Sequence, residues 1–438
     1  MKKIKYYIFK TIQKLRNNKI INNSLIILST QSIAGIISFI NSFFSLKFIG
    51  VSGTGYVALA ISYATLFNGL FNFQSYNALI KFGAEAKEKK DSEKYKFYIK
   101  MAMIQDIITA FIAVFFGYIS LDFLSSFMNW NPLMKKYAQI YLITIPLNIT
   151  GSLNAILRLN DEFSITGIIN IYSNIFKFIL IILCGFLNSD LIFYIYIEMI
   201  YVAFLNLLRF YFAYKSLKKQ NLLNFVKTRL IFDKEFTKYN IFNNLVTSVD
   251  VPIGQAISLI INMILGVEVV GVYNFLLKIG TIVSQITESI SQAIFPEFSI
   301  MVAQNNIKKA IGIMKKMFYS MNFLGILSFL LIIVTFPIWL SWLIGDSSII
   351  YGISFALYFF YLFFAAAIMP MHLLFISLNY VQYNFIIVVI CNCIYLVLLF
   401  FLGTRFNLIG IIIAMIIQSS LVFISKYIIM KKNFEVSL

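Results

Sequence analysis

The chain has 438 residues, of which 60% are hydrophobic and only 12% are charged, and its mean hydropathy is +0.85. A water-soluble domain carries about 25% charged residues, so this composition excludes an ordinary soluble fold and indicates a membrane protein. The net charge of +18 would also fit a nucleic-acid-binding protein. In a membrane protein, however, basic residues report topology and contact with anionic lipid, so we expect no nucleic-acid partner.

Apolar segments of about 20 residues, the length that spans a bilayer, recur along the whole chain. The sequence therefore predicts an all-α membrane protein with about twelve transmembrane helices. The predicted spans cover residues 21–46, 55–80, 99–122, 137–157, 164–187, 191–213, 240–264, 268–296, 317–344, 350–378, 383–403 and 407–429.

The twelve spans divide into two pseudo-symmetric lobes of six helices each. The expected organisation is a basic cytoplasmic segment at 1–20, an N-lobe at 21–213, a cytoplasmic linker at 214–239, a C-lobe at 240–429 and a cytoplasmic tail at 430–438. The linker is rich in Lys and Asn and is the longest polar stretch between spans. The loops on the opposite side are short.

The distribution of basic residues predicts the orientation. If the N-terminus is cytoplasmic, 30 of the 36 Lys and Arg residues fall on the cytoplasmic side and four on the outer side. Cytoplasmic loops of membrane proteins are enriched in Lys and Arg. We therefore expect a multi-pass protein of the bacterial inner membrane with both termini in the cytoplasm.

Two glycine motifs, almost half a chain apart, indicate that the lobes are repeats. Residues 48–56 read FIGVSGTGY and residues 265–273 read LGVEVVGVY, each joining the first span of a lobe to the second. Gly50 and Gly266 are 216 residues apart, close to the half-length of 219. Glycine tolerates positive φ, so each motif is expected to make a tight turn. Same-sense repeats of this kind are typical of transporters.

These residues carry a family resemblance. Phe48–Ala60, with Ala84 and Glu85 closing the second span, resembles the start of Wzx-type polysaccharide repeat-unit flippases, which belong to the MATE-like multidrug/oligosaccharidyl-lipid/polysaccharide exporter superfamily. Leu265–Tyr273, followed by Ile294–Ser299, resembles their midpoint. The resemblance covers nearly the whole chain in length, span number and duplication.

The resemblance implies both a fold and a function. The expected fold places the two lobes around a central cavity. The expected function is translocation of undecaprenyl-pyrophosphate-linked oligosaccharide repeat units from the inner to the outer leaflet, for O-antigen, capsule or another surface polysaccharide. A glycan polymerase and a chain-length regulator are possible partners.

Polar residues at helical spacing mark the faces that could line such a cavity. In span 7 they run from Asn243 through Asp250 to Asn262, and in span 8 from Asn274 to Gln292. The uncharged cavity candidates on spans 1, 2 and 8 are Gln31, Asn41, Asn68, Asn72, Asn274 and Gln285. Two interpretations stay open, because polar groups can line a wet, sugar-binding groove or can join helices to one another.

The charged residues within spans are stronger candidates, because a charge in lipid costs a few kcal/mol or more. At 1.5 Å per residue, Lys278 and Asp250 each lie about 15 Å deep and could pair or share the cavity. Lys177 and Glu198 also lie at similar depths, and a structural ion pair is the favoured interpretation for them. Lys278 or Lys177 would attract the pyrophosphate, and Asp250, Glu288 or Glu198 could bind a coupling proton.

Basic residues near the cytoplasmic surface could gather the substrate head group from the inner leaflet. The candidates are Lys81, Arg158 and Arg209. Asp106 is expected only to border water on the same side, and the lone histidine, His372, is expected to serve packing.

No motif for nucleotide binding or catalysis is present. The sequence lacks G-x-x-x-x-G-K-[ST], H-E-x-x-H and G-x-S-x-G, so we expect no enzyme activity, cofactor or metal. Two rivals remain. A cation or drug antiporter of the same superfamily needs acidic groups, but residues 20–47 contain no Asp or Glu. A membrane glycan polymerase is expected to have a large outer loop, and the outer loops here are short.

Overall fold

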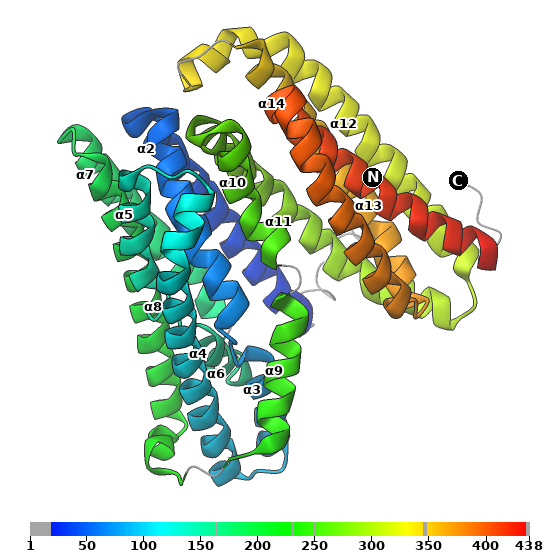
Figure 1. Ribbon diagram of the computed structural model, residues 1–438. Coiled ribbons are helices and arrows are strands. Elements are labelled where there is room, and N and C mark those ends of the chain that lie inside the picture. Colours follow the sequence, from blue (N-terminus) through cyan, green and yellow to red (C-terminus); the bar gives the residue numbers. More distant parts are fainter. Residues whose placement is uncertain (1–18, 163, 230–231, 249–250, 345–347, 435–438) are drawn as a thin grey trace, which may run out of the picture. The chain divides into compact units, whose positions relative to one another are not determined.

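A computed structural model describes the chain except for residues 1–18, 163, 230–231, 249–250, 345–347 and 435–438, and all regular elements in the described part are helices (Figure 1). The elements are α2 Lys19–Phe71, α3 Tyr76–Glu88, α4 Ser92–Phe127, α5 Pro132–Tyr141, η1 Leu142–Thr144, α6 Gly151–Leu159, α7 Ser164–Phe186, α8 Leu191–Lys219, η2 Leu223–Lys227, α9 Lys234–Ser248, α10 Val251–Leu265, α11 Val267–Ala303, α12 Ile307–Ile344, α13 Ile349–Ser377 and α14 Val381–Phe434.

Eight helices in the described part are long and apolar enough to cross a membrane. Two of them contain a non-helical residue that divides them into two span-length segments, Gly50 in α2 and Asn407 in α14. The prediction of an all-α membrane protein is confirmed, and the predicted spans correspond to observed helices, some of them interrupted.

The interruptions are where the predicted continuous spans are wrong. Span 137–157 is broken between Tyr141, where α5 ends, and Gly151, where α6 begins. Pro146 lies in this gap, and proline cannot donate the helical hydrogen bond and clashes with the preceding turn. Span 55–80 is broken at residues 72–75, between α2 and α3, and span 240–264 is divided into α9 and α10.

The helices form two compact units. Unit 1 comprises Met1–Asn41 and Ala60–Ala256, and unit 2 comprises Ser42–Leu59 and Ile257–Leu438. Unit 1 therefore includes α9, whereas unit 2 includes the glycine motif of residues 48–56. The lobe boundaries expected from the sequence stay predictions.

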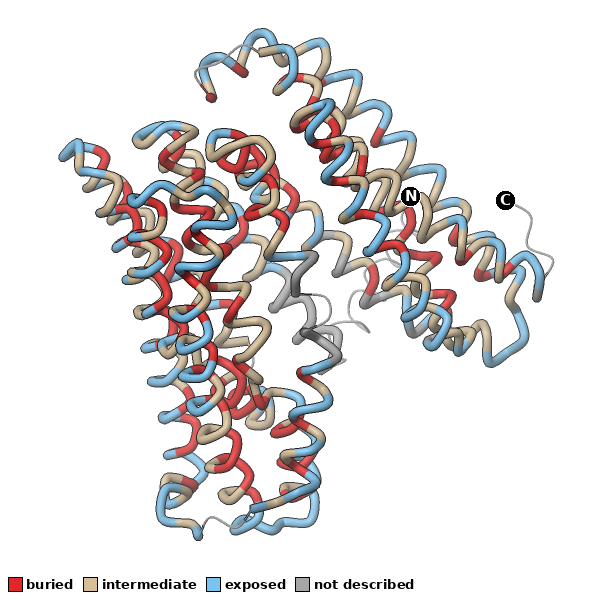
Figure 2. The backbone as a smooth tube through the Cα atoms, viewed as in Figure 1, coloured by how far each residue is buried: buried red, intermediate tan, exposed pale blue. Residues whose placement is uncertain are grey.

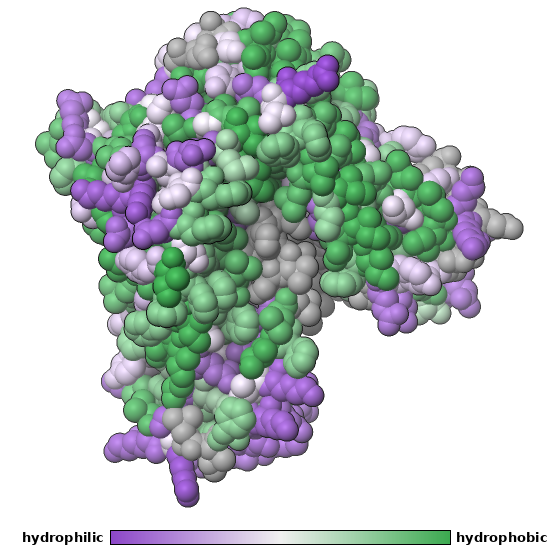
Figure 3. All heavy atoms as spheres, in the orientation of Figure 1, coloured by the Kyte–Doolittle hydropathy of each residue, from purple (hydrophilic) through white to green (hydrophobic). Residues whose placement is uncertain are grey.

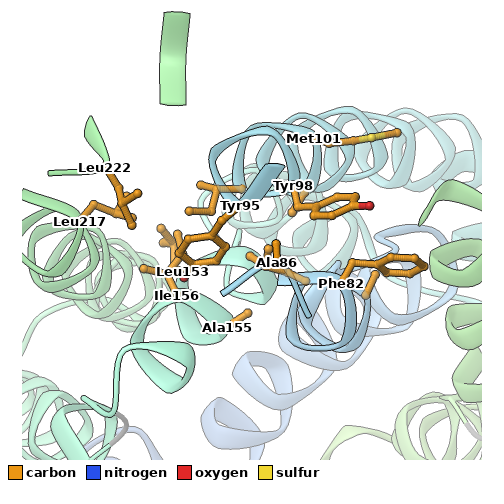
Figure 4. Close-up of a cluster of buried hydrophobic side chains, with 14 of the residues drawn as sticks. Phe82, Ala86, Tyr95, Tyr98, Met101, Leu153, Ala155, Ile156, Leu217 and Leu222 are labelled. Carbon is orange, nitrogen blue, oxygen red and sulfur yellow. The ribbon is translucent and has the colours of Figure 1, made fainter. Parts of the chain in front are cut away.

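The core of unit 1 joins α3, α4, α6, α8 and α9. Tyr95 and Tyr98 of α4 pack with Leu153 and Ile156 of α6 and with Leu217 of α8, as Figure 4 shows. This cluster holds the short helices α3 and α6 in place. A second cluster, in unit 2, joins the ends of α11, α12, α13 and α14 around Phe298, Met314, Phe375 and Met430.

The outward faces of the long helices are apolar, as a lipid environment requires. Val334 and Ile338 of α12 are 75% and 80% exposed, and Phe123 of α4 is 71% exposed. Figure 2 shows these exposed residues running beside buried ones along the helices, and Figure 3 shows that hydrophobic residues cover much of the visible surface.

Candidate functional site

The two glycine motifs adopt the same backbone conformation. Gly50 has φ 69° and ψ −178°, and Gly266 has φ 88° and ψ 175°. Residues with a side chain rarely occupy this region, so glycine is required at both turns. The tight turns predicted from the sequence are confirmed, and the 216-residue repeat is a structural repeat.

The motifs also pack against each other reciprocally within unit 2. A Cβ on Gly55 would collide with the backbone oxygen of Val267, and a Cβ on Gly271 would collide with the backbone oxygen of Val51. A shift of 216 residues converts one contact into the other. Such mutual exchange is the mark of a two-fold interface, here between the two repeats of one chain.

A hydrogen bond lies at the centre of this interface. The Ser52 hydroxyl donates to Glu268 Oε1 at 3.0 Å, and these two residues are also 216 positions apart. The repeats thus meet at equivalent positions, with small residues where the backbones approach closely. Because glycine contacts allow no slack, the interface has one well-defined packed state.

A buried carboxylate organises the helix breaks of unit 1. Asp106 of α4 is fully buried, so the expectation that it borders water is wrong. Its Oδ1 accepts the backbone N–H of Ser75 at 2.6 Å, and its Oδ2 accepts that of Ser152 at 2.8 Å. The carboxylate therefore satisfies amides at the starts of α3 and α6 together, where helix dipoles also favour negative charge.

Buried amides connect α9 to the same break. Asn240 Nδ2 donates to Ser75 Oγ at 3.0 Å and to Gln105 Oε1 at 2.9 Å. Asn244 Nδ2 donates to the backbone oxygen of Gln74 at 3.2 Å. Sequence reasoning missed this group, because none of its members belongs to a recognisable motif. Gly151 is its one local signal, since a Cβ there would collide with Gln74.

The predicted cavity residues of span 2 lie beside this group. Asn72 is buried and donates to Asn68 Oδ1 at 2.8 Å, and Thr109 of α4 donates to Asn72 Oδ1 at 3.3 Å. Asn72 therefore connects the broken end of α2 to α4. These contacts fit the interpretation in which polar residues join helices.

Lys177 of α7 and Glu198 of α8, which the depth estimate placed at similar levels, form an ion pair of 2.5 Å. Their side chains are 14% and 15% exposed, and Lys177 Nζ lies 5.0 Å from the centre of the Tyr201 ring. A pair this well buried is costly to break from one side.

Asn41 and Arg209 contact amides on α7 and α8. Asn41 Nδ2 donates to the backbone oxygen of Asn174 at 3.0 Å. Arg209 Nη1 and Nη2 donate to Asn206 Oδ1 at 3.3 Å and Asn170 Oδ1 at 3.5 Å. Arg209 is thus engaged between helices, whereas Lys81 and Arg158, the other two surface candidates, are exposed.

In unit 2, Asn274 of α11 donates to Ser258 Oγ of α10 at 3.2 Å, so polar residues of spans 7 and 8 do meet. Lys278 is exposed and Gln285 is half-buried, both on α11. Asp250 and the side chain of Glu288 lie outside the described residues. Gln31 of α2, in unit 1, is half-buried.

The lone histidine has an unexpected neighbour. His372 Nδ1 lies 2.7 Å from Lys426 Nζ, and Lys426 of α14 is only 1% exposed, although the sequence suggested a cytoplasmic loop position for it. The Lys426 ammonium also lies 5.7 Å from the Phe375 ring. Among the described residues, no group of three or more His, Cys, Asp and Glu side chains is arranged to hold a metal.

The comparisons with known proteins agree with one another. Residues 20–302 match the family described as polysaccharide biosynthesis protein. No curated protein matches the chain in sequence.

Solved structures of similar fold are transporters. An inward-facing multidrug resistance MATE family transporter of the MOP superfamily is 13% identical, with a TM-score of 0.75 over 95% of this chain and 100% of that chain. The lipid II flippase MurJ, in an inward closed conformation, is 13% identical, with a TM-score of 0.68 over 93% of this chain and 87% of that chain. A MATE transporter of Vibrio cholerae is 11% identical, with a TM-score of 0.55 over 94% and 96%. At these identities the likeness shows the fold alone.

Proposed function

The chain belongs to the polysaccharide biosynthesis protein family, and from this premise we propose that it moves lipid-linked oligosaccharides across a membrane. The substrate is an undecaprenyl-pyrophosphate-linked repeat unit, which passes from the inner to the outer leaflet of a bacterial inner membrane by alternating access. The product serves assembly of O-antigen, capsule or another surface polysaccharide. The protein acts as a transporter, without an enzymatic step of its own.

The observation that carries this proposal is the reciprocal contact of the two glycine motifs. Gly55 and Gly271 bring two repeat-related backbones together, and Ser52 bonds to Glu268 across them. Alternating access requires two equivalent halves that separate on one side of the membrane while they meet on the other. An interface built from equivalent residues gives such a transporter a defined closed state, which opens as a unit.

The charges support an anionic head group. Lys81 and Arg158 are exposed on the side where basic residues concentrate, and they attract the pyrophosphate of a lipid from the inner leaflet. Lys278 would receive it within the translocation path, while the polyprenyl tail stays in lipid. Lys177 is engaged with Glu198, so in this proposal the pair is structural. Asp250 and Glu288 stay candidates for a coupling proton.

Deletion of the protein tests the proposal in cells. Surface polysaccharide and the sidedness of undecaprenyl-linked repeat units are measured in the deletion strain and in a strain complemented with the wild type. The proposal predicts loss of surface glycan and single repeats that accumulate facing the cytoplasm. Single repeats that reach the outer face without being extended would identify a polymerase. Unchanged glycan together with increased drug sensitivity would identify a drug antiporter.

A further inference from the structure

An open hollow of about 630 Å³ lies between α3 and α9 in unit 1. Its volume falls within the range of about 300–1,000 Å³ that is usual for small-molecule sites. The residues that line it are Lys81, Phe82, Glu85, Glu235, Lys238, Tyr239, Phe242 and Asn243. Figure 3 shows hydrophilic residues gathered at the lower end of unit 1, where Figure 1 places the start of α9. The hollow thus combines charged, amide and aromatic side chains.

The two lysines of the hollow are held over aromatic rings. Lys81 Nζ lies 4.3 Å from the centre of the Tyr239 ring, and Lys238 Nζ lies 5.9 Å from the centre of the Phe242 ring. Within the described residues neither lysine forms an ion pair, whereas Glu85 is paired with Lys89 at 2.6 Å. Two ammonium groups therefore face the hollow with their charge unmatched by a direct carboxylate contact.

The walls of the hollow are fixed from behind. Phe236 of α9 is fully buried and its ring lies 5.5 Å from that of Phe82 and 5.4 Å from that of Tyr98. Asn77 of α3 also donates to Asn243 of α9 at 3.4 Å. Because both helices are anchored, the ring and charge positions exist before any ligand arrives, which lowers the entropic cost of binding.

The lining selects a ligand of mixed chemistry. Paired ammonium groups attract a diphosphate, because lysine binds phosphate as a point charge. The carboxylate of Glu235 and the amide of Asn243 accept hydrogen bonds from hydroxyl groups. The faces of Tyr239 and Phe242 suit the C–H face of a pyranose ring. A polyanion without hydroxyl groups would be repelled by Glu85 and Glu235, so a sugar diphosphate fits better than phosphate alone.

We propose that the hollow between α3 and α9 is a docking site for the diphosphate–sugar head group of a lipid-linked glycan, with Lys81 and Lys238 binding the diphosphate and Glu235 and Tyr239 binding the first sugar. This inference rests on the proposed function and adds the location at which the substrate is first bound. The hydrogen bonds of Asn240 and Asn244 connect the same helix, α9, to the break at residues 72–75. Occupancy of the hollow therefore bears on the geometry of that break.

Binding of two radiolabelled probes to the purified full-length protein in nanodiscs tests the proposal. The probes are farnesyl diphosphate and farnesyl diphosphate carrying one N-acetylglucosamine. The diphosphate-site variant is Lys81→Gln with Lys238→Gln, and the sugar-site variant is Glu235→Gln with Tyr239→Ala. The matched control is Lys215→Gln with Lys218→Gln, which removes the same charge from exposed positions of α8.

The proposal predicts that the diphosphate-site variant weakens binding of both probes by about tenfold or more. The sugar-site variant should weaken binding of the sugar-carrying probe alone, and the control should bind both probes within about twofold of wild type. Equal binding by wild type and the diphosphate-site variant would overturn the proposal. Displacement of both probes by dioleoylphosphatidylglycerol at comparable concentration would identify a phospholipid site and would also overturn it.

The failure of this inference is distinguishable from failure of the proposed function. If deletion of the protein stops glycan export but the diphosphate-site variant both binds the probes and exports glycan normally, the docking site is refuted and the function stands. If deletion leaves glycan export unchanged, the function itself is refuted.

Discussion

Replacement of Asp106 by asparagine should loosen the starts of α3 and α6 while the rest of unit 1 stays folded. The carboxylate accepts one N–H from each helix, at 2.6 and 2.8 Å, and is fully buried. The asparagine side chain has one oxygen acceptor and one NH₂ donor. It can therefore satisfy only one of the two amides and presents a donor to the other.

The magnitude follows from the cost of an unsatisfied buried group. Leaving one buried N–H without an acceptor costs about 1–3 kcal/mol. At about 1.4 kcal/mol per factor of ten, a loss of about 2 kcal/mol accelerates hydrogen exchange at the affected amides about thirtyfold. Asp106→Ala removes both acceptors and should have a larger effect, reduced by the relief of burying a charge.

Hydrogen–deuterium exchange of the purified protein measures this directly. Peptides that contain Ser75 and Ser152 should exchange faster in Asp106→Asn, whereas peptides from α13, in unit 2, should not change. Asp122→Asn is the matched control, because Asp122 lies on the same helix but is 82% exposed and pairs with Lys135 at the surface. Wild-type exchange at both serine peptides in Asp106→Asn would refute the reasoning.

Three further predictions concern packing and charge. Gly55→Ala and Gly271→Ala should each lower thermal stability through overpacking of about 1–3 kcal/mol, because the new Cβ collides with backbone; equal melting temperatures would exclude the reciprocal contact. Lys87→Met should destabilise by about 1–2 kcal/mol, since Lys87 Nζ donates to the backbone oxygen of Leu159 at 2.6 Å at the end of α6; denaturant unfolding compared with Lys218→Met measures it. Lys177→Met alone should destabilise by about 3–5 kcal/mol, and adding Glu198→Leu should recover most of the loss with transport intact; a double variant that is stable but inactive would show that the pair binds substrate.

The sequence predicted the features whose causes are local. Glycine at positions 50 and 266 is required by the backbone itself, so two turns 216 residues apart could be recognised from composition alone. Apolar run length predicted the membrane helices for the same reason. Depth counting along two straight helices sufficed to place Lys177 beside Glu198.

The helix breaks could not be predicted, because their cause is distant in the chain. The break at residues 72–75 contains no proline or glycine and is stabilised by Asp106, which lies 31 residues from Ser75 and 46 residues from Ser152. An apolar window therefore continues across the break. The hollow between α3 and α9 was missed for the same reason, since Lys81 and Lys238 are brought together only by the packing of Phe82 on Phe236.

Reconstituted translocation tests the central claim most directly. The purified protein is placed in proteoliposomes with a short-chain polyprenyl-diphosphate-linked N-acetylglucosamine, and an impermeant galactosyltransferase added outside labels the sugar that is exposed on the outer leaflet. The account predicts that protein-containing vesicles label the inner-leaflet half of the substrate far faster than protein-free vesicles, and that Lys81→Gln with Lys238→Gln slows this phase. Equal labelling with and without the protein would contradict it.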